Sequence, residues 1–128
     1  MDYAGVLAQW LREQAALQAL TSCVYARVLT AAALRKSDAC VVVNERPEVD
    51  EPTYGDAALV THVAFDVDVY ANDAGKLAQI VDEVTALLNG QDGVAAFQGL
   101  WLTSADVPVF SDVSFRFRKR LSFRGALK

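Results

Sequence analysis

The sequence contains few of the side chains on which metal binding and nucleophilic catalysis depend. Its 128 residues include one histidine and two cysteines. His62 cannot complete a metal site with Cys23 and Cys40, whose spacing is not that of zinc ligands. The sequence also lacks a glycine-rich phosphate loop, a nucleophile elbow and a CxxC pair. These absences predict a protein that is not an enzyme and has no catalytic residues, no metal and no cofactor.

Long apolar runs are absent as well. No stretch approaches the roughly 20 apolar residues that a membrane helix needs. Asp2 stands where a secretory signal would carry basic residues. We therefore expect a soluble intracellular protein. In a reducing cytosol a disulfide is conceivable, but Cys23 and Cys40 are predicted to be two buried thiols.

Proline is scarce, and two of the three prolines lie in one acidic segment. Residues 46–58 contain Pro47, Pro52 and four acidic side chains. Two prolines exclude a central strand, and little in this segment could enter a core. We therefore predict a mobile acidic loop over residues 46–58, a kind of long connection that often has a function.

Charge is distributed unevenly along the chain. The formal net charge is -4, yet residues 116–128 carry 6 basic side chains and no acidic one. Residues 1–115 carry 16 acidic and 6 basic side chains. Such asymmetry suggests association between unlike surfaces. With 53% hydrophobic residues and no internal repeat, the chain is expected to form one domain over residues 1–128.

The most regular stretch of the sequence runs from Leu59 to Gly90. Apolar and polar residues alternate over 59–70, which is the period of a strand with one face against a core. Apolar residues then recur every three or four positions over 77–88, as in an amphipathic helix. Asn72 is the expected N-cap and Gly90 the expected C-cap. A strand followed by a helix that folds back over it predicts a two-layer unit.

The remaining elements follow from the same two periods. A helix is expected over residues 3–20, with Asp2 as its N-cap. Strands are expected over 39–45, 97–103 and 112–124, a short strand within 23–30, helical propensity over 31–36 and a loop over 104–111. The predicted fold class is α+β, a mostly antiparallel sheet of about four to five strands with two α-helices packed on one face.

Two carboxylates are candidates for site chemistry. Asp66 and Asp68 project from the same side of one strand, with His62 on that side as well. A carboxylate pair can support acid–base or metal chemistry. However, no third acid or second histidine follows at a ligand-like spacing. The favoured interpretation is ion pairing with the arginine row of the last strand, if the two strands are neighbours.

That arginine row consists of Arg116, Arg118, Arg120 and Arg124, which alternate with apolar residues. Such a row could contact phosphates of a nucleic acid. No aromatic side chain is interleaved on its face, and the whole protein is acidic, which argues against sequence-specific binding. A subunit contact, or a lining that tolerates DNA nearby, remains open beside a plain solvated face.

The order of these elements resembles that of a known family. A helix ending in AALQAL is followed closely by VYARVL and, after a gap, by a valine-rich strand, ACVVVNE. FDVDVYA then leads directly into DAGKLAQIVDEVTALLNG, and DVSFRFRKRLSF forms the last strand. In these features the chain is similar to the tail-completion, or tail-terminator, family of long-tailed (siphovirus-like) bacteriophages and gene transfer agents.

The resemblance implies a structural role in a virion. Such proteins form a ring, typically of six, at the head-proximal end of the tail tube, where they stop polymerisation and provide the head–tail joining surface. The implied partners are further copies of the chain, the tail-tube protein, a head-completion or connector protein, and DNA that passes through the ring without sequence-specific binding; no membrane is implied. The implied location is the virion tail or neck, and the host cytoplasm during assembly.

The resemblance also suggests where contacts lie. The expected interface residues are in the acidic loop, on the polar face of the 60–70 strand and in the arginine row: Glu48, Asp50, Glu51, His62, Asp66, Asp68, Arg116, Arg118, Arg120 and Arg124. Two alternatives remain. One is a head-closure or connector protein of the neck, and the other is a small-molecule-binding or enzymatic α+β domain with His62, Asp66 and Asp68 as its polar centre.

Overall fold

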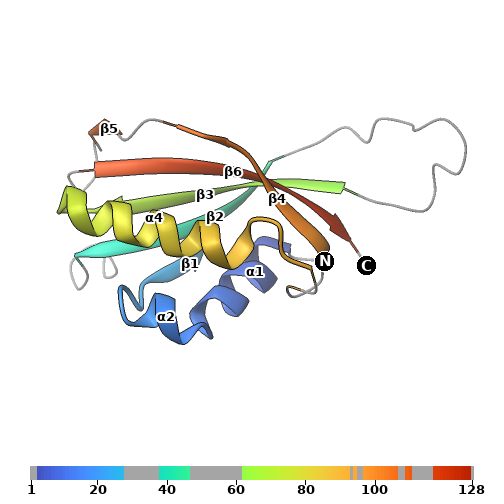
Figure 1. Cartoon of the computed structure of the whole chain (residues 1–128), viewed down its shortest axis with the longest axis horizontal. Coiled ribbons are helices and arrows are strands. Elements are labelled where there is room, and N and C mark those ends of the chain that lie inside the picture. The colour runs from blue at the N-terminus through green and yellow to red at the C-terminus, as the bar shows by residue number, and fades with distance from the viewer. Residues whose placement is uncertain are drawn as a thin grey trace, which may run out of the picture.

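A sheet with helices on one face is the framework of the molecule (Figure 1). The computed structural model describes residues 3–27, 38–46, 62–92, 94, 97–106, 109–110 and 117–127. It gives only the backbone at five of these positions: His62, Gln98, Val109, Phe110 and Leu127. The predicted helical segment at 31–36, the acidic loop from residue 47 onward and residues 112–116 of the last strand lie outside the described residues.

The sheet contains six strands in the described part of the chain, in the order β1-β2-β3-β6-β4, with β5 also pairing with β6. β1 and β2 run parallel, and every other pair is antiparallel. The predicted α+β class with a mostly antiparallel sheet is therefore confirmed. The strands are β1 Val24–Ala26, β2 Ala39–Arg46, β3 His62–Ala71, β4 Phe97–Ala105, β5 Val109–Phe110 and β6 Phe117–Leu127.

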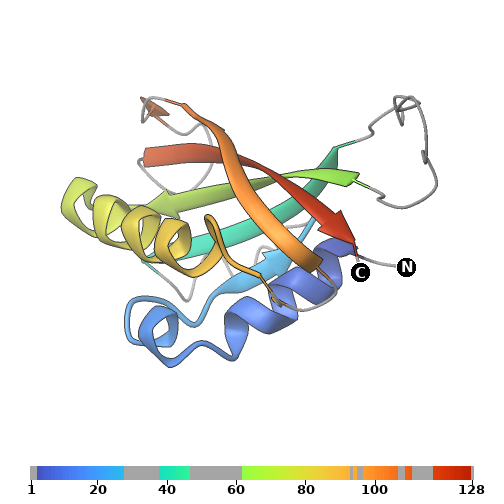
Figure 2. The ribbon, with the colours of Figure 1, turned by 45° about the vertical axis from the view of Figure 1, so that its right-hand side comes forward.

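In the described part of the chain, three helices cover one face of this sheet, namely α1 Tyr3–Arg12, α2 Ala15–Gln18 and α4 Ala74–Leu88 (Figures 1 and 2). α1 packs against β1 and β2, whereas α4 packs against β3, β6 and β4. The core between the two layers is apolar, because each strand turns its apolar positions towards the helices. Its largest fully buried side chains include Leu7, Leu17, Phe65, Ile80, Phe97 and Phe123. Among the described residues, no helix is long and apolar enough to cross a membrane.

The unit formed by β3 and α4 follows the expected pattern. Phe65, Val67 and Val69 are buried on the helix side of β3. The predicted apolar stripe of α4 is likewise buried: Leu77, Ile80, Val81, Val84 and Leu88. Together they place this strand and helix at the centre of the core.

The caps of α4 each lie one residue from the predicted position, since the C-cap is Asn89 rather than Gly90. The N-cap is Asp73 rather than Asn72, because the Asp73 carboxylate accepts a hydrogen bond of 3.0 Å from the backbone N–H of Lys76. Asn72 lies one residue too early and donates its backbone N–H to the carbonyl of Asp38. Gly90 follows the helix end with φ of +73°, a left-handed conformation that glycine adopts without strain.

The N-terminal helix is broken, contrary to the prediction of one helix over 3–20. Gln14 has an extended backbone, with ψ of 115°. Its side-chain amide donates 3.0 Å to the carbonyl of Trp10, and the amide of Gln18 donates to the carbonyl of Arg12. These side chains bind carbonyls in the last turn of α1, where backbone donors become scarce; the Trp10 carbonyl also accepts from the N–H of Glu13 at 3.2 Å. The break allows Leu17 of α2 to be fully buried.

The C-terminal strands differ from the prediction in length. Ser104 and Ala105 continue β4, and Val109–Phe110 forms β5, so the predicted loop over 104–111 was wrong in these parts. β6 continues past Arg124 to Leu127. A Cβ at Gly125 would lie 2.5 Å from the ring of Phe97, so glycine at that position allows β4 and β6 to pack closely.

Candidate assembly surface

The face of the sheet opposite the helices carries charged side chains beside an apolar cluster of Cys23, Cys40 and Val42. Because successive side chains of a strand point to opposite faces, the strands that bury Phe65 and Phe123 present charged residues on this side. We call it the open face, and among the described residues it includes Arg46 of β2, Asp66 and Asp68 of β3, and Arg118, Arg120, Ser122 and Arg124 of β6. The register sets Asp68 directly opposite Arg120 and Asp66 opposite Ser122.

Arg120 and Asp68 form a bidentate ion pair. Arg120 Nε donates to Asp68 Oδ1 at 2.9 Å, and Nη2 donates to Oδ2 at 3.3 Å. Asp68 is 3% exposed, whereas the Arg120 side chain is 40% exposed. The hydrogen bond that Arg120 donates to Asp68 raises the pKa of Arg120 above its ordinary value. The predicted pairing between these two strands is therefore confirmed for this arginine.

Asp66 is held by donors from both neighbouring strands. Arg46 Nε lies 3.1 Å from Asp66 Oδ1, and Ser122 Oγ donates to the same oxygen at 2.8 Å. Arg120 Nε is 4.0 Å from Asp66 Oδ2. Two carboxylates thus meet two guanidinium groups, and charge-assisted bonds of this kind compensate the cost of burying Asp66 and Asp68. The cluster links β2, β3 and β6.

These bonds determine what the carboxylates can do. Both acids accept from guanidinium or hydroxyl donors, so their role in the folded chain is to hold three strands together. No group of three His, Cys, Asp or Glu side chains within the described part of the chain is placed to hold a metal ion. The arrangement therefore favours the interpretation as cross-strand ion pairing over the acid–base or metal alternative.

The other predicted interface residues divide into two groups. Arg118 lies opposite Tyr70, and Arg124 lies opposite Ala64 on β3 and Trp101 on β4. His62 begins β3 opposite Ala126, but only its backbone is described. The rest lie outside the described residues: Glu48, Asp50, Glu51 and Arg116.

Two members of the ionic cluster were missed from the sequence. Arg46 was assigned to the start of the acidic loop, although it lies two residues after Asn44 and therefore on the same face of β2. Ser122 was not recognised as a partner of Asp66. Its role depends on the register between β3 and β6, which the sequence does not specify.

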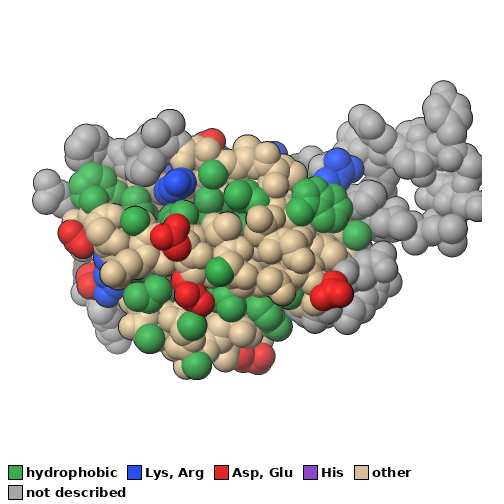
Figure 3. Space-filling model, viewed as in Figure 1, with side chains coloured by type: hydrophobic (Ala, Val, Ile, Leu, Met, Phe, Trp, Pro, Cys, Tyr) green, Lys and Arg blue, Asp and Glu red, His purple; other side chains and the backbone are tan. Residues whose placement is uncertain are grey.

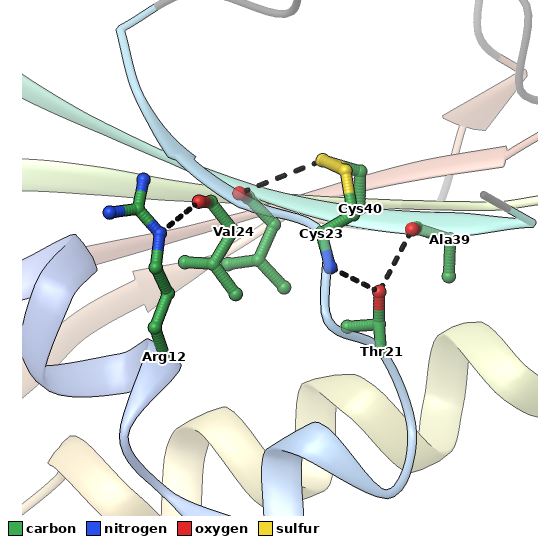
Figure 4. Close-up of a disulfide and its surroundings, with 7 residues drawn as sticks. Arg12, Thr21, Cys23, Val24, Ala39 and Cys40 are labelled. Carbon is green, nitrogen blue, oxygen red and sulfur yellow. Dashed lines mark hydrogen bonds between the residues drawn. A yellow bond between two sulfur atoms is a disulfide. The ribbon is translucent and has the colours of Figure 1, made fainter. Parts of the chain in front are cut away.

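Cys23 and Cys40 form a disulfide, so the prediction of two free thiols was wrong (Figure 4). The predicted burial is correct, since Cys23 is 6% and Cys40 0% exposed. Cys23 precedes β1, and its carbonyl accepts from Val41 N–H of the neighbouring β2 at 2.8 Å. Thr21 supports the same turn, because its hydroxyl donates to the Ala39 carbonyl and accepts from Cys23 N–H. The parallel pairing of β1 with β2 therefore brings the two cysteines together.

Side chains and turns occupy the outer edges of the sheet. At the β1 edge, Arg12 Nε donates to the Val24 carbonyl at 2.7 Å (Figure 4). At the β4 edge, Leu102 N–H donates to the Asn89 side chain at 2.8 Å, and Leu100 exchanges backbone hydrogen bonds with Gly90 and Gln91. These particular backbone groups, which could otherwise bind another strand, are therefore already satisfied.

The helix side carries acidic groups. In Figure 3 acidic side chains are scattered over the helical layer, with few basic ones between them. Asp82 and Asp92 are exposed there, and Glu83 is half-buried. The open face carries the arginine row of β6. Among the described residues the two faces therefore differ in charge, although Asp66 and Asp68 lie on the open face and Lys119 on the helix side.

Fold and site together define a small two-layer α+β domain in which buried aspartates bind arginines and a serine of the neighbouring strands. Residues 5–122 match the family described as Tail completion protein gp17. The chain therefore belongs to this tail completion family and is a structural component of a phage-type tail. The resemblance inferred from the element order is confirmed.

A solved structure shows the same fold. The chain is similar to a chain in the structure described as "Virion of native gene transfer agent (GTA) particle", with a TM-score of 0.69 and 19% sequence identity. The similarity covers 98% of this chain and 93% of the other. A search of curated proteins found no match.

Proposed function

We propose that the protein forms a closed ring, with six copies, at the head-proximal end of the tail tube. The ring ends tail polymerisation and provides the surface to which the head is joined. DNA passes through its centre without sequence-specific contacts. The match of residues 5–122 to the tail completion family carries this proposal.

Two structural features support a ring. The open face carries the arginine row, and the helical layer carries exposed acids, so one copy presents two unlike surfaces. Unlike surfaces that bind each other produce head-to-tail contacts, which close into rings when the rotation permits. In addition, the edges of the sheet are occupied by Arg12 and Asn89, which favours contacts through faces rather than through strand pairing.

The proposal is tested by deleting the gene in the producing strain and imaging the particles by negative-stain electron microscopy. We expect abnormally long tails that are not attached to filled heads, because nothing ends tube growth or provides the joining surface. Supplying the wild-type gene on a plasmid is the control, and it should restore tails of normal length. Tail lengths are measured on both populations.

Two other outcomes would contradict the proposed role. Free tails of normal length beside leaking or empty heads would assign it to head closure in the neck. Intact particles of normal infectivity, or normal gene-transfer activity, would remove it from virion assembly. Both results contradict termination of the tail tube.

A further inference from the structure

A groove on the helical side of the domain has the chemistry of a cation-binding site. It lies between the end of α1 and the end of α4, with a volume of about 360 Å³. Trp10 and Gln14 line one side, and Ala86, Leu87, Gln91 and Asp92 line the other. The groove therefore combines an indole ring with three polar side chains.

The polar groups that remain available in the groove are hydrogen-bond acceptors. Gln14 Nε2 donates to the Trp10 carbonyl at 3.0 Å, and Gln91 Nε2 donates to the Ala86 carbonyl at 3.3 Å. Each amide thereby retains its oxygen as an acceptor. Asp92 is exposed and, within the described residues, makes no hydrogen bond or ion pair. A carboxylate, two amide oxygens and the indole ring suit a guanidinium group, which donates in one plane and stacks on aromatic rings.

Among the described arginines, Arg118 remains available for such a contact. Among the described cationic side chains, only Arg118 and Lys119 have no hydrogen bond or ion pair, since Arg120 is bound to Asp68. Arg118 lies on the open face opposite Tyr70, whereas Lys119 lies opposite Val69, on the helix side. Arg118 and the groove are therefore on opposite faces of the domain and cannot meet within one copy.

We propose that Arg118 of one copy enters the groove of the next copy, where it pairs with Asp92 and stacks on Trp10. This inference rests on the proposed ring and identifies its subunit contact. The contact joins two different surfaces, so each copy uses its groove once and its arginine once. Such a head-to-tail contact can be continued around a ring.

The experiment uses two charge reversals, Asp92→Arg and Arg118→Glu, supplied separately and together to the deletion strain. Each variant alone should lower the fraction of normal-length, head-joined tails about tenfold or more, because losing one partner of an interfacial charge pair weakens association at least that much. In a mixture, the Asp92→Arg copy provides a native Arg118 and the Arg118→Glu copy a native groove. If the two kinds of copy alternate around the ring, half of the contacts join a native Arg118 to a native Asp92. The other half join the introduced glutamate to the introduced arginine, which is the same ion pair with its charges exchanged.

Matched controls separate the pairing from a general charge effect. Asp106→Arg and Lys119→Glu introduce the same changes of charge at exposed or half-buried positions that do not line the groove. Lys119 follows Arg118 in the sequence but lies on the other face of β6. Both should give tails of normal length. Circular dichroism and thermal unfolding of all four purified variants check that each is folded, so that a loss of joined tails reports assembly.

The outcomes distinguish this inference from the proposed function. If deletion gives long tails but Arg118→Glu supports normal ones, the contact is wrong and the terminator role stands. If both reversals fail and the mixture fails as well, the groove binds another tail protein, which also overturns the contact between copies. If deletion leaves particles normal, the proposed function and the contact fall together.

A direct test joins the two positions covalently. Asp92→Cys and Arg118→Cys in one chain should produce a ladder of disulfide-linked copies from purified particles on a non-reducing gel. Asp106→Cys with Lys119→Cys is the matched control and should give monomers. Linked copies in the control but not in the test pair would contradict the proposal.

Discussion

The two faces of β3 and β6 are stabilised in opposite ways, although the same two strands supply both. On the helix side, Phe65 and Phe123 stack with ring centroids 5.7 Å apart and are closed off by the helical layer. On the open face, Asp68 is bound by Arg120 across the same pair of strands. The helix side depends on a second layer, whereas the open face depends on the register between strands.

The largest loss of stability is expected from a substitution on the helix side of the sheet. Phe123→Ala removes a fully buried ring that packs on Phe65, so we expect the free energy of unfolding to fall by about 3–5 kcal/mol. Urea denaturation followed by circular dichroism measures it. Phe123→Leu is the control and should cost distinctly less, because most of the buried volume is kept. A loss below about 1 kcal/mol for the alanine variant would mean that this layer is not tightly packed.

A smaller loss of stability is expected from a substitution on the open face. Asp68→Asn leaves Arg120 without its ionic partner, and we expect a loss of roughly 1–2 kcal/mol, less than for a fully buried pair because Arg120 is 40% exposed. The same urea experiment on Arg120→Gln and on the double variant gives the coupling energy. Additive losses in this cycle would show that the pair contributes no coupling.

The smallest loss of stability is expected from breaking an exposed ion pair at one end of β2. Lys76 Nζ donates to Asp38 at 3.0 Å, and this hydrogen bond lowers the pKa of Asp38 below its ordinary value of 3.8. A lowered pKa in the folded state stabilises the fold above the ordinary value, and this stabilisation is lost as the pH falls through the lowered pKa.

We therefore expect Asp38→Asn to unfold at a slightly lower temperature than the wild type at neutral pH and at the same temperature in strong acid. Thermal unfolding at the two pH values measures the difference. The neutral-pH difference should also shrink in high salt, because the pair is exposed. A difference that persists in acid would rule out the ion pair as its cause.

The contrast between the two faces also shows what could be predicted from the sequence. The apolar periods of β3 and α4 repeat over many residues, so they identified the elements, the buried face and the fold class. Ion pairing of Asp66 and Asp68 with the arginine row was predicted on the condition that the two strands are neighbours. The family resemblance came from the same elements, because their order along the chain can be read directly.

Features that depend on single positions could not be predicted in the same way. The break at Gln14 arises from one side chain bound to the Trp10 carbonyl, within a segment of high helix propensity. The disulfide depends on the parallel pairing of β1 with β2, and the role of Arg46 depends on the strand register. The groove requires α1 and the end of α4 to meet, which no local pattern indicates.

The occupied sheet edges have a consequence for how the protein behaves before assembly. A free strand edge is a template on which other chains can add, and it can start aggregates or fibres. In this chain Arg12 binds a backbone carbonyl of β1 and Asn89 binds a backbone N–H of β4, so these groups are not available to an added strand. In the proposed role this matters, because a component that stops one polymer must not begin another.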